Sequence, residues 1–176
     1  MIRWLIFIIL ILAAAGGFLI WHRYGASNER ADREQYYGLD QEDEIAVVVN
    51  NEVVRDEADS SAEESETSPA PGKVYDGQYY IEYSVVRDRI NSRFYWDPNE
   101  NILLYTLPEG NVAVEVGSNE YTDVAEKKSA DYTILKTEGS TAYIALPFIQ
   151  EYTNMDYEVY DDPVRAVITS EWGVRP

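Results

Sequence analysis

Two copies of one pattern run through the sequence, and this repeat is the strongest constraint on how the chain can fold. Residues 45–56, IAVVVNNEVVRD, return as residues 112–123, VAVEVGSNEYTD. An acidic residue with glycine, a Tyr-Ile pair and an Asp-Pro turn follow each copy: Asp76-Gly77, Tyr80-Ile81 and Asp97-Pro98, then Glu138-Gly139, Tyr143-Ile144 and Asp162-Pro163. Each repeat, residues 45–107 and 112–169, is too small to bury a core alone, so the two are expected to pack into one domain.

Within each repeat, the order of apolar runs and turn residues predicts a ββ-β-α-ββ unit. The runs at 46–49 and 112–116 meet Asn-Asn or Gly-Ser-Asn, residues that tolerate the positive φ of tight hairpins. A short strand, a brief helix and an aromatic hairpin follow. We expect an α+β fold, in which the duplicated unit forms a twisted, mainly antiparallel sheet with two short helices, preceded by one transmembrane helix.

Helix-capping residues mark the ends of the two short helices. Ser84 is expected to cap the first helix, and Pro147 fits the first turn of the second. Asn91 and Asn154 end the two helices at matching positions, as a left-handed cap would require. Apolar side chains at helical spacing are expected to face the sheet; they are Val86, Ile90, Phe148, Ile149 and Tyr152.

The first 23 residues differ from the rest in composition. Residues 4–21 carry no charge and would form ~27 Å of helix, close to the thickness of a bilayer, with Trp4 and Trp21 at its ends. Cleavage after Ala13-Ala14-Ala15 would make the segment a signal peptide, but apolar residues follow directly. Residues 1–23 are therefore predicted to be a single-pass signal anchor, with the C-terminal domain extracytoplasmic.

Composition shifts divide the rest of the chain. Residues 24–43 are predicted to be an acidic stalk, and 44–170 the folded domain. The acidic tract 57–72 is expected to be a disordered loop inside the first repeat, since its flanks both belong to the repeat. Residues 171–176 are expected to be the truncated start of a following segment.

Charge and residue usage exclude several functions. A net charge of −18 argues against nucleic acid as a partner, because phosphate contacts need a basic patch. The chain has no cysteine, so disulfides, thiolate zinc sites and thiol nucleophiles are excluded. Its single histidine, His22, lies at the expected membrane boundary. No catalytic residue, metal site or cofactor is predicted.

Two groups of polar residues have the composition of a chemical site. Carboxylates at 156, 158, 161 and 162 have the composition of paired catalytic acids, but strand spacing favours a solvated hairpin. Asp97, Asn99 and Asn101 alternate as calcium ligands do, yet the glycine and the distal glutamate of such a loop are missing. A simple turn is the favoured interpretation.

Aromatic residues are more abundant than either polar group and are better candidates for a binding surface. Flat rings with a polar group suit sugar faces or peptide partners, and they equally suit half-buried strands. Alternation places Tyr95 on the opposite face from Phe94 and Trp96, so some rings must point outward. The candidate ligand-binding aromatics are Tyr79, Tyr83, Tyr95, Trp96, Tyr157 and Tyr160, with Tyr105 among the same strand rings.

The motifs together resemble a known family. A Val-rich strand, an Asn turn, Asp76-Gly77 followed by Tyr80-Ile81, a short helix and Trp96-Asp97-Pro98 resemble the copper amine oxidase N-terminal-like domain over residues 44–170. That resemblance implies a duplicated α+β module of exported bacterial envelope proteins. With the anchor and the stalk, residues 91–97 and 103–106 look like the N-terminal region of membrane-anchored family 18 glycoside hydrolases, which continue into an SH3-like module and a catalytic barrel.

Neither activity is carried over to this chain. Copper ligation in that family needs several histidines, and a catalytic barrel needs ~250 residues. The sequence therefore predicts a non-catalytic, membrane-anchored extracytoplasmic module that binds or positions a cell-envelope component, either glycan or protein. The alternative is the targeting part of a longer family 18-type hydrolase whose barrel is absent. A third interpretation is a spacer that binds nothing.

Overall fold

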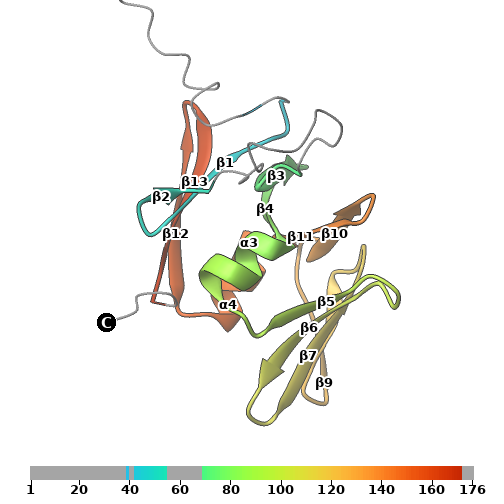
Figure 1. The fold of residues 1–176 in the computed structure, drawn as a ribbon. Helices are drawn as coiled ribbons and strands as arrows, with labels where there is room; N and C mark the ends of the chain where they lie inside the picture. Colours follow the sequence, from blue (N-terminus) through green and yellow to red (C-terminus); the bar gives the residue numbers. More distant parts are fainter. Residues whose placement is uncertain (1–38, 40–41, 55–68, 172–176) are drawn as a thin grey trace, which may run out of the picture. The chain divides into compact units, whose positions relative to one another are not determined.

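The computed structural model describes residue 39 and residues 42–54 and 69–171, all of which belong to one compact unit, Tyr37–Pro176 (Figure 1). The predicted anchor, most of the stalk and the acidic residues 57–68 lie outside the described residues. In the described part of the chain, no helix has both the length and the apolar character needed to cross a bilayer.

The described strands form three small sheets, mostly antiparallel, with two short helical segments between them. Sheet A has the order β10 (Leu135–Glu138), β11 (Thr141–Ala145), β4 (Gln78–Glu82), β3 (Gly72–Tyr75). Sheet B has the order β12 (Met155–Asp161), β13 (Val164–Ser170), β1 (Ala46–Val49), β2 (Glu52–Val53). Sheet C has the order β5 (Phe94–Asp97), β6 (Ile102–Leu107), β7 (Gly110–Glu115), β8 (Glu120–Asp123), β9 (Glu126–Ser129). The helical segments are α3 (Tyr83–Val85), which continues as the π-helical turn η2 (Val86–Ile90), and α4 (Leu146–Tyr152).

This arrangement confirms an α+β fold and corrects its details. The expected single sheet is wrong, because the hairpins pair into three separate sheets. The first half contains one strand more than expected, β3, and the second half contains two, β9 and β10. The order ββ-ββ-α-ββ therefore recurs with β9 inserted in the second copy. Sheets B and C each combine hairpins from both halves of the chain.

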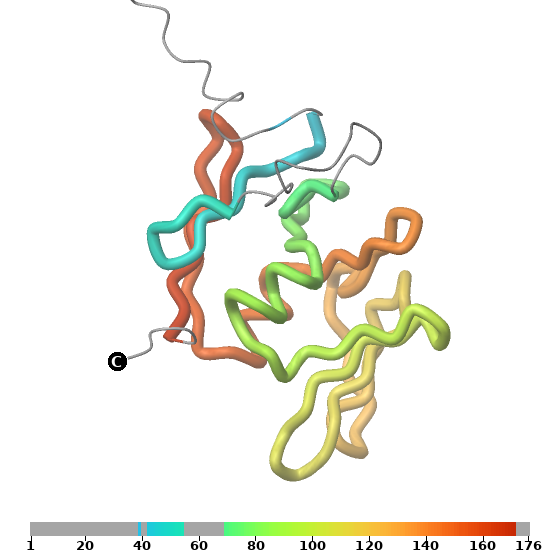
Figure 2. Tube along the Cα trace, in the orientation of Figure 1, coloured from blue at the N-terminus to red at the C-terminus, as the bar shows by residue number. Residues whose placement is uncertain are grey.

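One strand pair in sheet B is parallel. β1 runs beside β13 with Ala46 opposite Arg165 and Val49 opposite Ile168. Figure 2 shows the first described strand, in blue-green, beside the last, in red. The ends of the described domain are therefore joined by direct hydrogen bonding, which no local turn could impose.

Sheet A lies at the junction of the two halves. Ile81 on β4 is paired with Ile144 on β11, and both side chains are fully buried. Pairing of Glu138 with Thr141 makes Gly139 and Ser140 the turn residues of the second hairpin, where the first has Asp76 and Gly77. The sequence alignment of Glu138-Gly139 with Asp76-Gly77 was thus wrong by one residue.

The two turns of sheet A differ in backbone conformation. Asp76 and Gly77 both have positive φ, 53° and 77°, as a type I′ turn requires. In the second turn, only Gly139 has positive φ, at 57°, which matches a type II′ turn.

The helices bury the predicted faces but end differently from the prediction. Val86, Ile90, Phe148 and Ile149 are buried, and Tyr152 is half-buried against the core. Pro147 does lie in the first turn of α4.

The predicted caps are wrong. The cap of α3 is Glu82, whose carboxylate accepts a hydrogen bond from the Val85 amide at 3.2 Å, so Ser84 is not the cap. Asn91 is extended, at φ −160°, and α4 ends at Thr153, also extended, so Asn91 and Asn154 form no left-handed caps.

The last residues of the expected disordered loop are part of the fold. Ala70 is buried, and its carbonyl accepts a hydrogen bond from the Tyr143 hydroxyl at 3.2 Å. Pro71 accepts from the Glu82 amide at 3.0 Å, and Gly72 accepts from the Ile45 amide at 3.0 Å. The prediction of a loop through residue 72 is therefore wrong at its C-terminal end.

Each helical segment packs against a different outer sheet. On α4, Phe148 meets Tyr121 of sheet C with ring centroids 5.4 Å apart, and Tyr152 meets Tyr105 at 5.7 Å. The carbonyl of Ile90, at the end of η2, accepts a hydrogen bond from the Ser170 hydroxyl of β13 at 3.3 Å. These contacts hold the helical segments against strands of sheets B and C.

Candidate functional site

The aromatic residues predicted to bind a ligand do not gather at one place. They lie on sheets A, B and C and on α3, and they differ in exposure. Tyr95 is 54% exposed and Tyr160 is 40% exposed, whereas Trp96 and Tyr105 are buried. The remaining three, Tyr79, Tyr83 and Tyr157, are half-buried.

Side-chain contacts occupy some of these rings. The Arg165 guanidinium lies over the Tyr160 ring, 4.4 Å from its centroid, and that of Arg87 lies 5.5 Å from the Tyr83 centroid. Tyr95 makes no ring or cation contact with the described residues. Its ring is the most accessible large apolar surface of the candidates.

Tyr95 belongs to a row of side chains that crosses the outer face of sheet C. Strand register places Tyr95 opposite Leu104, Leu104 opposite Ala113, Ala113 opposite Thr122, and Thr122 opposite Lys127. Leu104, Ala113 and Thr122 are half-exposed, and Lys127 is exposed. We call the surface formed by these five residues the Tyr95 face.

Alternation along β5 explains why the face is open. Phe94 and Trp96 point inward and are 1% and 9% exposed, while Tyr95 between them points to solvent. This agrees with the prediction that some rings of the strand must point outward. The indole N–H of Trp96 has no hydrogen-bond partner among the described residues, which is unfavourable for a buried polar group and leaves packing to hold the ring in the core.

A shallow pocket of about 240 Å³ continues the Tyr95 face across β6, β7, β8 and β9. Its lining includes Ala113, Thr122 and Lys127 of the row, with Ile102, Glu115 and Glu120 beside them. The surface combines apolar area with both signs of charge. Alternation within each strand indicates the outward residues, but which of them become neighbours depends on register between strands.

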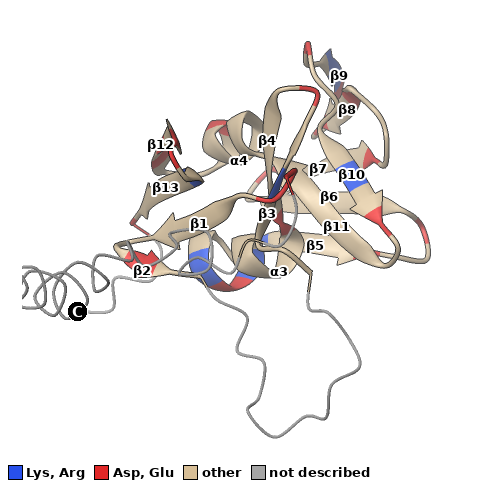
Figure 3. Cartoon of the chain, turned by 90° about the horizontal axis from the view of Figure 1, so that it is seen from above, with Lys and Arg blue, Asp and Glu red and all other residues tan. Residues whose placement is uncertain are grey.

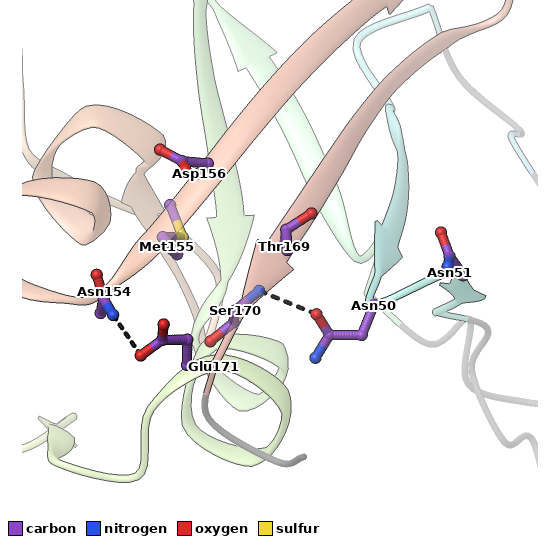
Figure 4. Close-up of a pocket in the computed structure, with 8 residues that line it drawn as sticks. All are labelled: Asn50, Asn51, Asn154, Met155, Asp156, Thr169, Ser170 and Glu171. Atoms are coloured by element: carbon purple, nitrogen blue, oxygen red, sulfur yellow. Dashed lines mark hydrogen bonds between the residues drawn. The ribbon is translucent and has the colours of Figure 1, made fainter.

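A larger pocket of about 400 Å³ opens at one end of sheet B, lined by residues 50–51, 154–156 and 169–171 (Figure 4). Asn50 and Asn51 form the β1–β2 turn with φ of 50° and 69°. The Asn50 side-chain oxygen accepts a hydrogen bond from the Ser170 amide at 2.9 Å, which ties the turn to the end of β13. The sequence predicts a turn at Asn50 and Asn51 and gives no sign of the pocket.

The acidic residues at 97, 156 and 158 lie at a turn and on an exposed strand. Asp156 and Glu158 are both exposed on β12, and acidic side chains follow this edge strand (Figure 3). The Asp97 carboxylate accepts hydrogen bonds from the amides of Asn99, at 2.9 Å, and Glu100, at 3.2 Å, as a turn cap does. No cluster of acidic or histidine side chains able to hold a metal ion occurs among the described residues.

A buried lysine forms the densest charged cluster. Lys73 on β3 donates to Glu138 at 2.7 Å and to Asp43 at 3.2 Å, and the Tyr75 hydroxyl donates to Glu138 at 2.6 Å. Burial acts to lower the pKa of Lys73, but the hydrogen bonds and charges of Glu138 and Asp43 outweigh it and raise that pKa. The lysine therefore stays protonated, which makes it a cross-link between the two halves and a poor base or nucleophile.

Comparison with known proteins adds no assignment, since no protein family, no curated protein and no solved structure matches this chain.

Proposed function

We propose that this chain is a non-catalytic binding module of the cell envelope, and that the Tyr95 face holds its partner, a glycan or a protein. The single observation that carries the proposal is Tyr95, which is 54% exposed at one end of the row that crosses sheet C. Tyrosine combines a large apolar ring with a polar hydroxyl and is enriched at interfaces, so an accessible tyrosine beside further apolar residues suits a contact surface.

The neighbours of Tyr95 suit such a contact. Leu104 and Ala113 extend the apolar area, and Thr122 and Lys127 supply a hydroxyl and a cation at the far end of the row. Adjacent strands are ~4.8 Å apart, so this row spans ~19 Å across five strands. That length suits several sugar rings of a glycan strand or an extended peptide.

The proposal extends to the whole chain. Residues 1–23 anchor it in the membrane as a single-pass segment, and the domain is extracytoplasmic. The recurring element order supports a duplicated unit, of the kind found in the copper amine oxidase N-terminal-like domain. The non-catalytic part rests on composition, because the chain has no cysteine and only one histidine, His22.

Retention on insoluble peptidoglycan tests the glycan version. The full-length chain in mild detergent is incubated with purified sacculi, and the retained fraction is measured for wild type, Tyr95→Ala and Tyr160→Ala. We expect Tyr95→Ala to weaken retention at least about fivefold, the effect of a side chain worth about 1 kcal/mol. Tyr160→Ala is the matched control, since Tyr160 is also exposed but lies on sheet B.

Two results would contradict the proposal. If wild type with a normal circular dichroism spectrum is not retained, and a photo-crosslinking residue at position 95 captures no envelope protein, the Tyr95 face has no partner. If Tyr95→Ala and Tyr160→Ala weaken retention equally, binding does not depend on this face.

A further inference from the structure

We infer that the pocket at the end of sheet B is a second, separate binding site, which takes a neutral or amino-bearing saccharide through its hydroxyl groups. We call it the asparagine pocket, after Asn50, Asn51 and Asn154. It shares no lining residue with the Tyr95 face, so this inference does not depend on the function proposed there.

The asparagine pocket is built from three segments that are distant in sequence. They are the β1–β2 turn, the connection from α4 to β12, and the end of β13 (Figure 4). The bond from the Ser170 amide to the Asn50 oxygen holds the first segment to the third. Asn154 donates to the Glu171 carboxylate, which holds the second segment to the third. The walls are thus cross-linked by the same side chains that line the cavity.

These cross-links leave polar atoms oriented and unused. With its oxygen on Ser170, Asn50 presents its amide nitrogen as a donor, and Asn154, with its nitrogen on Glu171, presents its oxygen as an acceptor. The Asn51 amide and the Thr169 hydroxyl make no hydrogen bond to the described residues. The cavity lining therefore offers both donors and acceptors. A hydroxyl both donates and accepts, so a ring with several hydroxyls matches this pattern best.

Charge and shape narrow the ligand further. Asp156 and Glu171 place two carboxylates at the rim, and none of the described residues that line the cavity is a cation, so an anionic sugar is disfavoured and an amino group is tolerated. Met155, which is 5% exposed, supplies an apolar floor on which the C–H face of a ring can lie. The volume, about 400 Å³, falls in the ~300–1,000 Å³ range of small-molecule sites.

The turn alone explains only part of this arrangement. Positive φ at Asn50 and Asn51 restricts those positions to asparagine, aspartate or glycine. Glycine is the usual residue at the second position of such a turn, yet here it is Asn51, whose side chain lines the cavity without an internal bond. Replacing Asn51 by glycine therefore removes a ligand group while the turn is kept.

Titration of the full-length chain in detergent with three monosaccharides tests the site. Glucose, glucosamine and glucuronate are the neutral, cationic and anionic probes, and amide NMR shifts of the lining residues report binding. We expect glucose and glucosamine to bind with dissociation constants of ~1–10 mM, and glucuronate at least about tenfold more weakly. The variant N51G is expected to weaken glucose binding at least about threefold.

Two matched variants separate binding from folding. N101G changes another asparagine of positive φ, 54°, in the β5–β6 turn, and should bind all three probes as wild type does. N50D keeps the oxygen that bonds the Ser170 amide but loses the nitrogen donor, and is expected to weaken glucose binding. The inference is overturned if no probe shifts the pocket amides at 50 mM, if glucuronate binds as well as glucose, or if both N51G and N50D bind as wild type. Tyr95→Ala leaves these titrations unchanged, which keeps the outcome separate from that of the Tyr95 face.

Discussion

Replacing Gly72 by alanine is expected to destabilise the domain, because there is no room for a methyl group at this position. Gly72 lies at the end of the tract expected to be a disordered loop, where a methyl group would be harmless. In the structure it opens β3, and a Cβ added there would lie 2.7 Å from Cγ1 of Ile45, 2.9 Å from Cγ2 of Val47 and 3.0 Å from the carbonyl oxygen of Tyr80. Ile45 and Val47 are fully buried, so neither can move away into solvent.

The expected cost of Gly72→Ala follows from these contacts. Inserting a methyl group into a packed core costs about 1–3 kcal/mol, because neighbours must leave their preferred rotamers. With a urea m-value of ~2 kcal/mol/M, a loss of about 2 kcal/mol lowers the unfolding midpoint by about 1 M. The measurement is urea unfolding of the full-length chain, followed by far-ultraviolet circular dichroism.

A double-mutant cycle with Val47→Ala shows whether the cost comes from this contact. Removing Cγ2 of Val47 makes room for the new methyl group, so the double variant should be at least about 0.5 kcal/mol more stable than the sum of the single effects. Gly117→Ala is the control: φ there is +78°, no atom lies within 4 Å of the added Cβ, and its cost should show no coupling to Val47. A midpoint shift below about 0.3 M for Gly72→Ala, or additivity with Val47→Ala, would refute the packing of β3 described here.

Two further measurements probe the core and the charged cluster. Trp96→Ala is expected to destabilise the domain by about 3–5 kcal/mol, because the ring is only 9% exposed. Trp96→Phe is expected to cost clearly less, because it keeps a buried ring and removes the unpaired N–H. Thermal melts measure both, and only a small loss for Trp96→Ala would place the ring outside the core. Glu138→Gln tests the pH dependence of stability. Hydrogen bonds from Lys73 and Tyr75 hold the pKa of Glu138 below its usual value of 4.5. The contribution of Glu138 to folding stability is therefore present above pH 4.5 and is lost as the pH falls through the lowered pKa. The urea midpoint should therefore fall less between pH 7 and pH 3 in Glu138→Gln than in wild type, and an equal fall in both would contradict this role.

Periodic patterns in the sequence predicted which side chains share a face of a strand or a helix. Alternation placed Tyr95 on the opposite face from Phe94 and Trp96 without deciding which face is outside, and helical spacing assigned Val86 and Ile90 to the core. These predictions hold because the direction of a side chain follows from strand or helix geometry alone.

The periodicity of side chains within one strand does not predict which strands pair with one another. β3 and β10 were missed because LKTE, the sequence of β10, has a single strongly apolar residue, and β3 follows an acidic tract. Each becomes a strand through its hairpin partner, with Tyr75 opposite Gln78 and Leu135 opposite Ile144. The division into three sheets likewise depends on contacts such as Tyr143 with Glu82, which no local pattern encodes.

The candidate sites illustrate the same limit. Tyr95 was identified from composition and alternation, but its neighbours Ala113, Thr122 and Lys127 become neighbours only through the register of four strand pairs. The asparagine pocket was missed because its walls come from segments separated by more than 100 residues, as the bond between Asn50 and Ser170 shows.

The parallel pairing of β1 with β13 determines how the domain responds to a force that pulls its two ends apart. A pull on the N-terminal side of β1 and on the C-terminal side of β13 drags the two strands in opposite directions along their length, because both run the same way. The hydrogen bonds between residues 46–49 and 165–168 are then sheared together, whereas an antiparallel hairpin pulled from its open end would lose its bonds one after another. Resistance to such force is set by the unfolding rate. A chain that is held at one end and pulled at the other would therefore load the domain in the direction in which many hydrogen bonds must break at once.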